Sequence, residues 1–281
     1  MTWQTIVRKE FSDAIRSLVL WIVSGVFVLF GVLLVGSYII LQEEFSPPDA
    51  DPGTALDAMV FVLSPIALVA PIVALIVGYK AIVGERESGS LKVLLSLPHT
   101  RWDVMFGKLI GRTLVVVVPL IIALVVMASL ISVFVEPIGL IEYLTVFVIS
   151  ILFASVFVAI AVAISGATRS STVAGAAMFG VYVLFMLFWD LINLGLLYLA
   201  EGRLTPQPEP PSWYLLFDML SPDGAYLIAA QGLLPEIDLY GGLFPEDVPW
   251  YLSEWAALLI LLVWLVIPFA IGFYRFDRSD L

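Results

Sequence analysis

Apolar residues gather in six long blocks along the chain, and polar residues gather in the connections between these blocks. Each block holds about 20 apolar residues, the length that an α-helix needs to cross a hydrocarbon core about 30 Å thick. The ten-residue alternation of a membrane β-barrel is not seen. The pattern therefore predicts six transmembrane helices, over about 19–41, 58–79, 113–135, 141–164, 173–199 and 255–274.

The second and third blocks contain prolines. Pro65 and Pro71 in the second block predict a kink or a local break, because proline removes a backbone donor from a helix. Pro119 lies inside the third block.

The segment 2–17 precedes the first block and has its own helical pattern. Apolar residues recur at helical spacing on one face, and polar or basic residues including Arg8 and Lys9 occupy the other face. This pattern predicts an amphipathic helix in the membrane interface, with its apolar face in lipid and its basic face towards anionic headgroups. The alternative is a soluble tail.

Composition supports an integral helical membrane protein. The chain has 281 residues, of which 61% are hydrophobic, above the roughly half expected of a soluble domain. It contains no cysteine, which excludes disulfides and Cys-based metal sites, and its single histidine, His99, excludes a His-pair metal site. The first apolar block is too long for a cleavable signal peptide, so we expect it to remain as an anchor.

Charge is distributed unevenly, although the net charge is −11. Twelve of the thirteen Lys and Arg residues fall in the amino-terminal segment, in the connections after the second and fourth blocks, and in the carboxyl-terminal tail; Arg203 is the exception. The positive-inside rule places these segments in the cytoplasm. We therefore expect a multi-pass protein of the cell membrane with both termini cytoplasmic.

The connection 80–112 combines six basic residues with a helical pattern. Thr100 and Asp103 have the spacing of a capping box at the start of a helix that enters the third span. A helix as short as the one expected before Thr100 is unstable alone in water, so it must pack on something. The expected elements are a helix continuing from the second span to Gly84 or beyond, a turn at Gly89 with a cap from Ser88 or Ser90, a short helix over 91–97, and a stop at Pro98.

This connection contains no nucleotide-binding loop. Gly84 and Gly89 have the glycine spacing of a phosphate-binding loop, but Ser90 and Leu91 follow where that motif requires Lys and then Ser or Thr. No other stretch fits the motif. We therefore expect no ATPase activity, and no cofactor, in this chain.

The long loop 201–254 contains two apolar pieces, 213–220 and 225–234, that are too short to cross the membrane. Ser221, Pro222 and Asp223 form a cap, a first-turn proline and an early acid, so the second piece should begin there. The loop is either a pair of re-entrant or interfacial helices, or a folded outer cap away from any transport path.

Asp190 and Asn193 are polar residues within the fifth block. A charge in lipid is costly, so Asp190 is either a substrate or proton contact, or a carboxylate at the wet outer end of the span. The small residues of 165–177 allow close helix packing or a dimer contact.

The run GERESGSLKVLLSLPHTRWDVMFGKLIG resembles the first cytoplasmic loop of ABC transporter permeases of the ABC-2 type. The layout of the whole chain is similar as well. In detail the loop looks closest to the permease group that includes the nitrous-oxide-reductase maturation permease. The resemblance rests on Glu85, Glu87, Gly89, Leu95, Pro98, Arg101 and Lys108.

The resemblance implies a function and a set of partners. Two permease copies, or one copy and a sister permease, would bind two soluble ATPase subunits that carry ATP and Mg, and substrate would be exported. The helix around 88–97 would be the coupling helix, with buried leucines and rim carboxylates facing the ATPase. The expected interface residues are Glu85, Glu87, Gly89, Leu91, Leu94, Leu95, Pro98 and Arg101.

Two other functions stay open from the residues alone. A membrane-embedded enzyme is one, although paired intramembrane acids are missing. An ATP-independent secondary transporter or an assembly factor is the other, although such transporters usually carry more polar groups at mid-membrane. An ATPase partner would distinguish the first function from both. Binding of nucleic acid is not expected.

Overall fold

A computed structural model describes residues 3–45, 54–97, 100–206, 210–234, 237, 239–240, 242–245 and 247–279. Within these residues the chain forms helices and no strand. The elements are α1 Trp3–Arg16, α2 Leu18–Phe45, α3 Ala55–Gly78, α4 Val83–Glu87, α5 Ser90–Ser96, α6 Arg101–Phe134, α7 Leu140–Ala167, α8 Ser171–Val183, the π-helix η1 Leu184–Phe188, α9 Trp189–Glu201, α10 Ser212–Met219, α11 Pro222–Leu233, the 3₁₀ turn η2 Trp250–Leu252 and α12 Glu254–Asp277.

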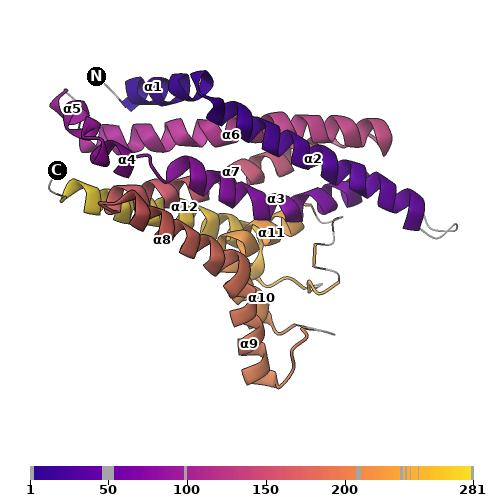
Figure 1. Ribbon diagram of the computed structural model, residues 1–281. Helices are drawn as coiled ribbons and strands as arrows, with labels where there is room; N and C mark the ends of the chain where they lie inside the picture. The colour runs from indigo at the N-terminus through magenta and orange to yellow at the C-terminus, as the bar shows by residue number, and fades with distance from the viewer. Residues whose placement is uncertain are drawn as a thin grey trace.

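Six helices of the described chain are long and apolar enough to cross a membrane, which confirms the predicted all-α integral membrane fold. They correspond to α2, α3 with α4, α6, α7, the run α8–η1–α9, and α12. Figure 1 shows α4, α5 and both termini at one end of the bundle, which we call the α5 end. The α10–α11 hairpin lies away from it.

The helix α7 is the centre of the bundle and packs against α3, α6, α11 and α12. Glycines on its neighbours allow close approach: a Cβ atom on Gly272 of α12 would come within 2.5 Å of the Ala163 Cα atom. A Cβ atom on Gly78 of α3 would come equally close to the Ala161 side chain. Small residues at helix crossings replace the hydrophobic driving force that lipid removes.

The second span is interrupted at a different place from the one predicted. The helix α3 continues through positions 65 and 71 without a break, and the break lies at 79–82, before the expected continuation to Gly84. The Ser165 side chain of α7 explains this position, because its Oγ accepts the N–H groups of both Ile82 and Val83 at 3.0 Å. A side chain from a distant helix thus satisfies the freed donors.

The fifth span bends at η1. A π-helical turn widens the backbone hydrogen bonding and often marks a change of direction. Figure 1 shows α8 running along the bundle and α9 turning away from it. Asp190 is the second residue of α9, after this turn.

The two short helices of the long loop form a hairpin that enters the bundle. Ser221 caps α11 as predicted, since its Oγ accepts the Gly224 N–H at 3.0 Å. Tyr226 of α11 is fully buried, with its hydroxyl 3.0 Å from that of Ser150 and its ring stacked on Phe153. Ser150 lies ten residues into α7, about 15 Å along its axis. This depth favours the re-entrant interpretation over an outer cap.

Candidate functional site

The α4–α6 connection has the turn and the cap that its sequence predicts. Gly89 has φ 76°, a left-handed conformation that glycine adopts without strain, and α5 begins at the next residue. At the other side of α5, the Thr100 Oγ1 accepts the Asp103 N–H at 3.0 Å and Asp103 accepts the Thr100 N–H at 3.1 Å. Pro98 lies outside the described residues.

The exposed apolar face of α5 differs from the predicted one. Leu91 is only 1% exposed and packs in the protein's own core, so it is not available to a partner. Leu94 and Leu95 are partly buried against the same core. Val93 and Leu97, four residues apart and therefore on one face, are 66% and 47% exposed.

Glu85 takes part in an ion-pair network within the chain. The Lys108 ammonium is fully buried and lies 2.8 Å from the Glu85 carboxylate and 2.7 Å from that of Glu10. Arg112 lies 2.9 Å from the second Glu10 oxygen. The network joins α1, α4 and α6, so the Glu85 oxygen that binds Lys108 is already used inside the protein rather than held free for a partner.

The network changes the acidity of Glu10. Burial alone would raise the pKa of this carboxyl, because an apolar surrounding disfavours its charge. The positive charges of Lys108 and Arg112 outweigh burial, and the pKa is lowered overall. Glu10 is therefore ionised at neutral pH, and α1 is held to α6 by charge as well as by packing.

The amphipathic helix α1 lies on α6 through its apolar stripe. Ile6, Glu10 and Ala14 are its buried residues, and the stripe faces two glycines of α6. A Cβ atom on Gly107 would lie 2.8 Å from the Ile6 Cβ, and one on Gly111 would lie 2.6 Å from the Glu10 Cβ. The acid at position 10, within this apolar stripe, is a signal from which the network could have been predicted, but it was missed.

Glu87 binds the start of α8. Its Oε1 accepts the Ser171 N–H at 2.7 Å, where the positive end of the α8 dipole favours a carboxylate. This hydrogen bond lowers the pKa of Glu87. Like Glu85, Glu87 thus has an intramolecular partner that the sequence did not indicate.

Arg101 binds the carboxyl end of α12. Its Nη1 donates to the carbonyls of Phe276 at 2.6 Å, Asp277 at 2.9 Å and Ser279 at 2.9 Å. Arg86 donates to the Thr168 carbonyl at 2.6 Å, at the end of α7. Arg101 thus makes contacts within the chain that the sequence did not indicate, and its contact with an ATPase stays a prediction.

Asn193 and Asp190 lie near the α10–α11 hairpin. Asn193 is 1% exposed and donates from Nδ2 to the Tyr214 carbonyl at 3.1 Å, so it attaches α9 to α10. The Asp190 side chain is exposed in the single chain, and its role as a substrate contact stays a prediction.

Burial raises the pKa of Asp218 on α10 to about 7, and Tyr240 donates to its carboxylate at 3.1 Å.

Burial also raises the pKa of Asp223 to about 6. Across the part of the chain that the structure describes, no three His, Asp or Glu side chains come together in a way that could hold a metal ion.

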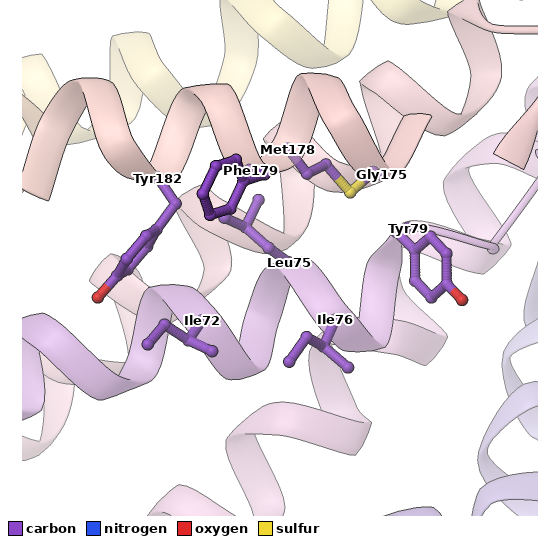
Figure 2. Close-up of a pocket in the computed structure, with 8 residues that line it drawn as sticks. All are labelled: Ile72, Leu75, Ile76, Tyr79, Gly175, Met178, Phe179 and Tyr182. Carbon is purple, nitrogen blue, oxygen red and sulfur yellow. The ribbon is translucent and has the colours of Figure 1, made fainter. Parts of the chain in front are cut away.

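A groove of about 500 Å³ lies between α3 and α8. Figure 2 shows Ile72, Ile76 and Tyr79 on one wall, with Phe179 and Tyr182 on the other. Its lining is almost wholly apolar. The second wall belongs to the run Ser171–Glu201. In its most apolar stretch this run is less buried than any of the other five spans of the described chain.

Comparison with known proteins decides the family. A family model described as ABC-2 family transporter protein matches residues 4–281. The chain belongs to the ABC-2 transporter family. It is 32% identical over 281 residues to the probable ABC transporter permease protein NosY of Stutzerimonas stutzeri, covering 97% of each chain. It is 33% identical over 287 residues to the protein of the same name from Pseudomonas aeruginosa, covering 99% of this chain and 98% of the relative.

These findings confirm the resemblance seen in the α4–α6 connection. This ABC-2 protein is a multi-pass permease, the membrane subunit of an ABC transporter. The relatives are named permeases, which is consistent with a membrane subunit of a transporter that is not itself an enzyme.

Proposed function

We propose that this permease is driven by a separate ATPase subunit that binds the α5 end of the bundle. The observation that carries the proposal is the exposed pair Val93, on the short helix α5, and Leu97, the residue that ends it. Apolar side chains at the centre of an interface supply affinity when a partner covers them. ATP and Mg would be bound by that partner.

The fixed flanks make α5 suitable for transmitting force. On the α4 side, Glu85 is joined to Lys108 of α6, and on the other side the Thr100 cap leads directly into α6. A displacement of α5 therefore has a path into α4, which belongs to the second span, and into α6. The basic residues at this end support a cytoplasmic position for it and for both termini.

We further propose that two copies of the permease pair, and that export is the direction of transport. The groove between α3 and α8 and the exposed apolar face of α8 are surfaces that a second copy would cover. Gly175 and Gly180 add no side chain to this face, which allows close approach of another helix. A sister permease could occupy the same place.

The experiment is a pull-down of tagged permease in mild detergent. We expect a soluble P-loop ATPase to co-purify with wild type and to be lost from the double variant Val93→Asp/Leu97→Asp. The matched control is Leu204→Asp/Val248→Asp, which adds the same charges at exposed apolar residues of the loop between the fifth and sixth spans. Equal recovery of the ATPase with both double variants would contradict the proposed site, and its absence from wild type would contradict the proposed partner.

A further inference from the structure

The carboxyl end of α12 is held by two arginines that flank α5 in the sequence. Arg101, the first residue of α6, satisfies three carbonyls at the end of α12. Arg86 of α4 donates to the Ser279 hydroxyl at 2.9 Å. Carbonyls at a helix end have no partner within the helix, so these cations stabilise them by hydrogen bonds and by the helix dipole.

Aromatic rings extend this contact. The centroid of the fully buried Phe276 ring lies 5.9 Å from the Arg86 guanidinium group and 5.7 Å from that of Arg101. One turn away, the Trp102 ring meets Phe269 and Phe273 of α12 edge-on, with centroids 5.9 and 5.0 Å apart. The helix α4 and the start of α6 therefore move together with the end of α12, unless these contacts break.

At its other half, α12 binds the α10–α11 hairpin. Trp264 donates from Nε1 to the Leu220 carbonyl at 2.9 Å, in the turn between the two short helices. Where α12 begins, Glu254 packs so tightly on Gly232 of α11 that a Cβ there would lie 2.7 Å from the Glu254 Cβ. The helix α12 is continuous from Glu254 to Asp277, through Pro268.

The two contacts therefore lie on one helix. Trp264 and Phe276 are twelve residues apart, about 18 Å along the axis. We propose that Arg101 is a positioning residue of transport: it clamps α12 to the α5 connection, so that a displacement of this connection reaches the α10–α11 hairpin through α12. This inference rests on the proposed function, because the ATPase supplies the displacement.

The test measures amide hydrogen exchange across residues 212–233 in the permease–ATPase complex, with and without ATP and vanadate. We expect a nucleotide-dependent change in the hairpin of the wild type. Arg101→Gln should lose this change while the ATPase still co-purifies, and Arg101→Lys should restore part of it because the charge and the donors remain. Arg275→Gln is the matched control, since this exposed arginine of the last α12 turn makes none of the three Arg101 contacts.

A second variant tests the route without touching the α5 end. Trp264→Phe removes the indole donor to the Leu220 carbonyl and reduces the ring that packs on Phe185. The hairpin should therefore lose its response while peptides of the α4–α6 connection keep theirs. A hairpin that does not respond in wild type, or that responds unchanged in Arg101→Gln and Trp264→Phe, overturns the inference and leaves the proposed function standing. Failure of the ATPase to co-purify with wild type overturns the proposed function itself.

Discussion

Replacement of Lys108 by methionine tests the buried ion-pair network most directly. The substitution keeps the length of the side chain and removes its charge. Glu10 keeps Arg112 at 2.9 Å, whereas Glu85 keeps only Lys9 at 3.8 Å. Removal of one partner from a buried ion pair costs about 3–5 kcal/mol, because the other charge stays buried. Since the Glu85 side chain is 19% exposed and Glu10 stays paired, we expect a loss of about 3 kcal/mol.

The assay is equilibrium unfolding in mixed micelles, followed by tryptophan fluorescence. Lys92→Met is the control, since Lys92 is exposed on α5 and its loss should change the free energy of unfolding by less than about 0.5 kcal/mol. The double variant Lys108→Met/Glu85→Gln should lose about 1–2 kcal/mol less unfolding free energy than the sum of the two single variants. The second substitution removes the Glu85 charge that Lys108→Met leaves without its buried partner. A loss below about 1 kcal/mol for Lys108→Met, or strict additivity, would refute the reasoning.

The same network predicts how stability depends on pH. The pKa of Glu10 in the folded protein is lowered from the ordinary value of 4.5. A carboxyl with a lowered folded pKa binds protons more readily when unfolded, so its contribution is complete above about pH 4.5 and is lost as the pH falls through the folded value. Unfolding measured from pH 7 to pH 3 should show this loss in wild type and a flatter profile in Glu10→Gln.

Three further predictions concern single positions. Gly89→Ala should cost about 1 kcal/mol of unfolding free energy, because a side chain disfavours φ 76°; the same assay checks it, and no loss would contradict the left-handed turn. Tyr226→Phe should lower the free energy of unfolding by about 1–3 kcal/mol, because the buried Ser150 hydroxyl loses this hydrogen-bond partner. An unchanged free energy would contradict the buried Tyr226–Ser150 hydrogen bond. Asp218→Asn should raise the free energy of unfolding at pH 8 by about 1 kcal/mol. The pKa of Asp218 in the folded protein is raised to about 7, so its ionised form destabilises the fold as the pH rises, and partial exposure limits the effect. A gain that persists at pH 4 would contradict this prediction.

The local features of this protein were predictable because their causes are local. The length of each apolar block determines whether it can span a membrane. The Thr100–Asp103 cap, the turn at Gly89 and the Ser221 cap depend on residues within four positions of one another. Each cap and turn could therefore be predicted from the sequence, and each is present in the fold.

The partners of distant polar groups were decided only by the tertiary structure. The family resemblance assigned Glu85, Glu87 and Arg101 to a contact with a partner protein, which stays a prediction. The fold adds contacts within the chain, to Lys108, the Ser171 backbone and the end of α12. These contacts join residues separated by 23 to 178 positions, and no local pattern encodes such pairings.

The position of the break in the second span was also decided by the tertiary structure and not by the local sequence. Proline marks where a helix loses a donor, yet α3 stays continuous through positions 65 and 71. The break at 79–82 is where Ser165 of another helix accepts the freed N–H groups. Within a membrane, backbone donors must be satisfied by protein rather than by water, so the position of an interruption follows from the neighbouring helix and not from the segment alone.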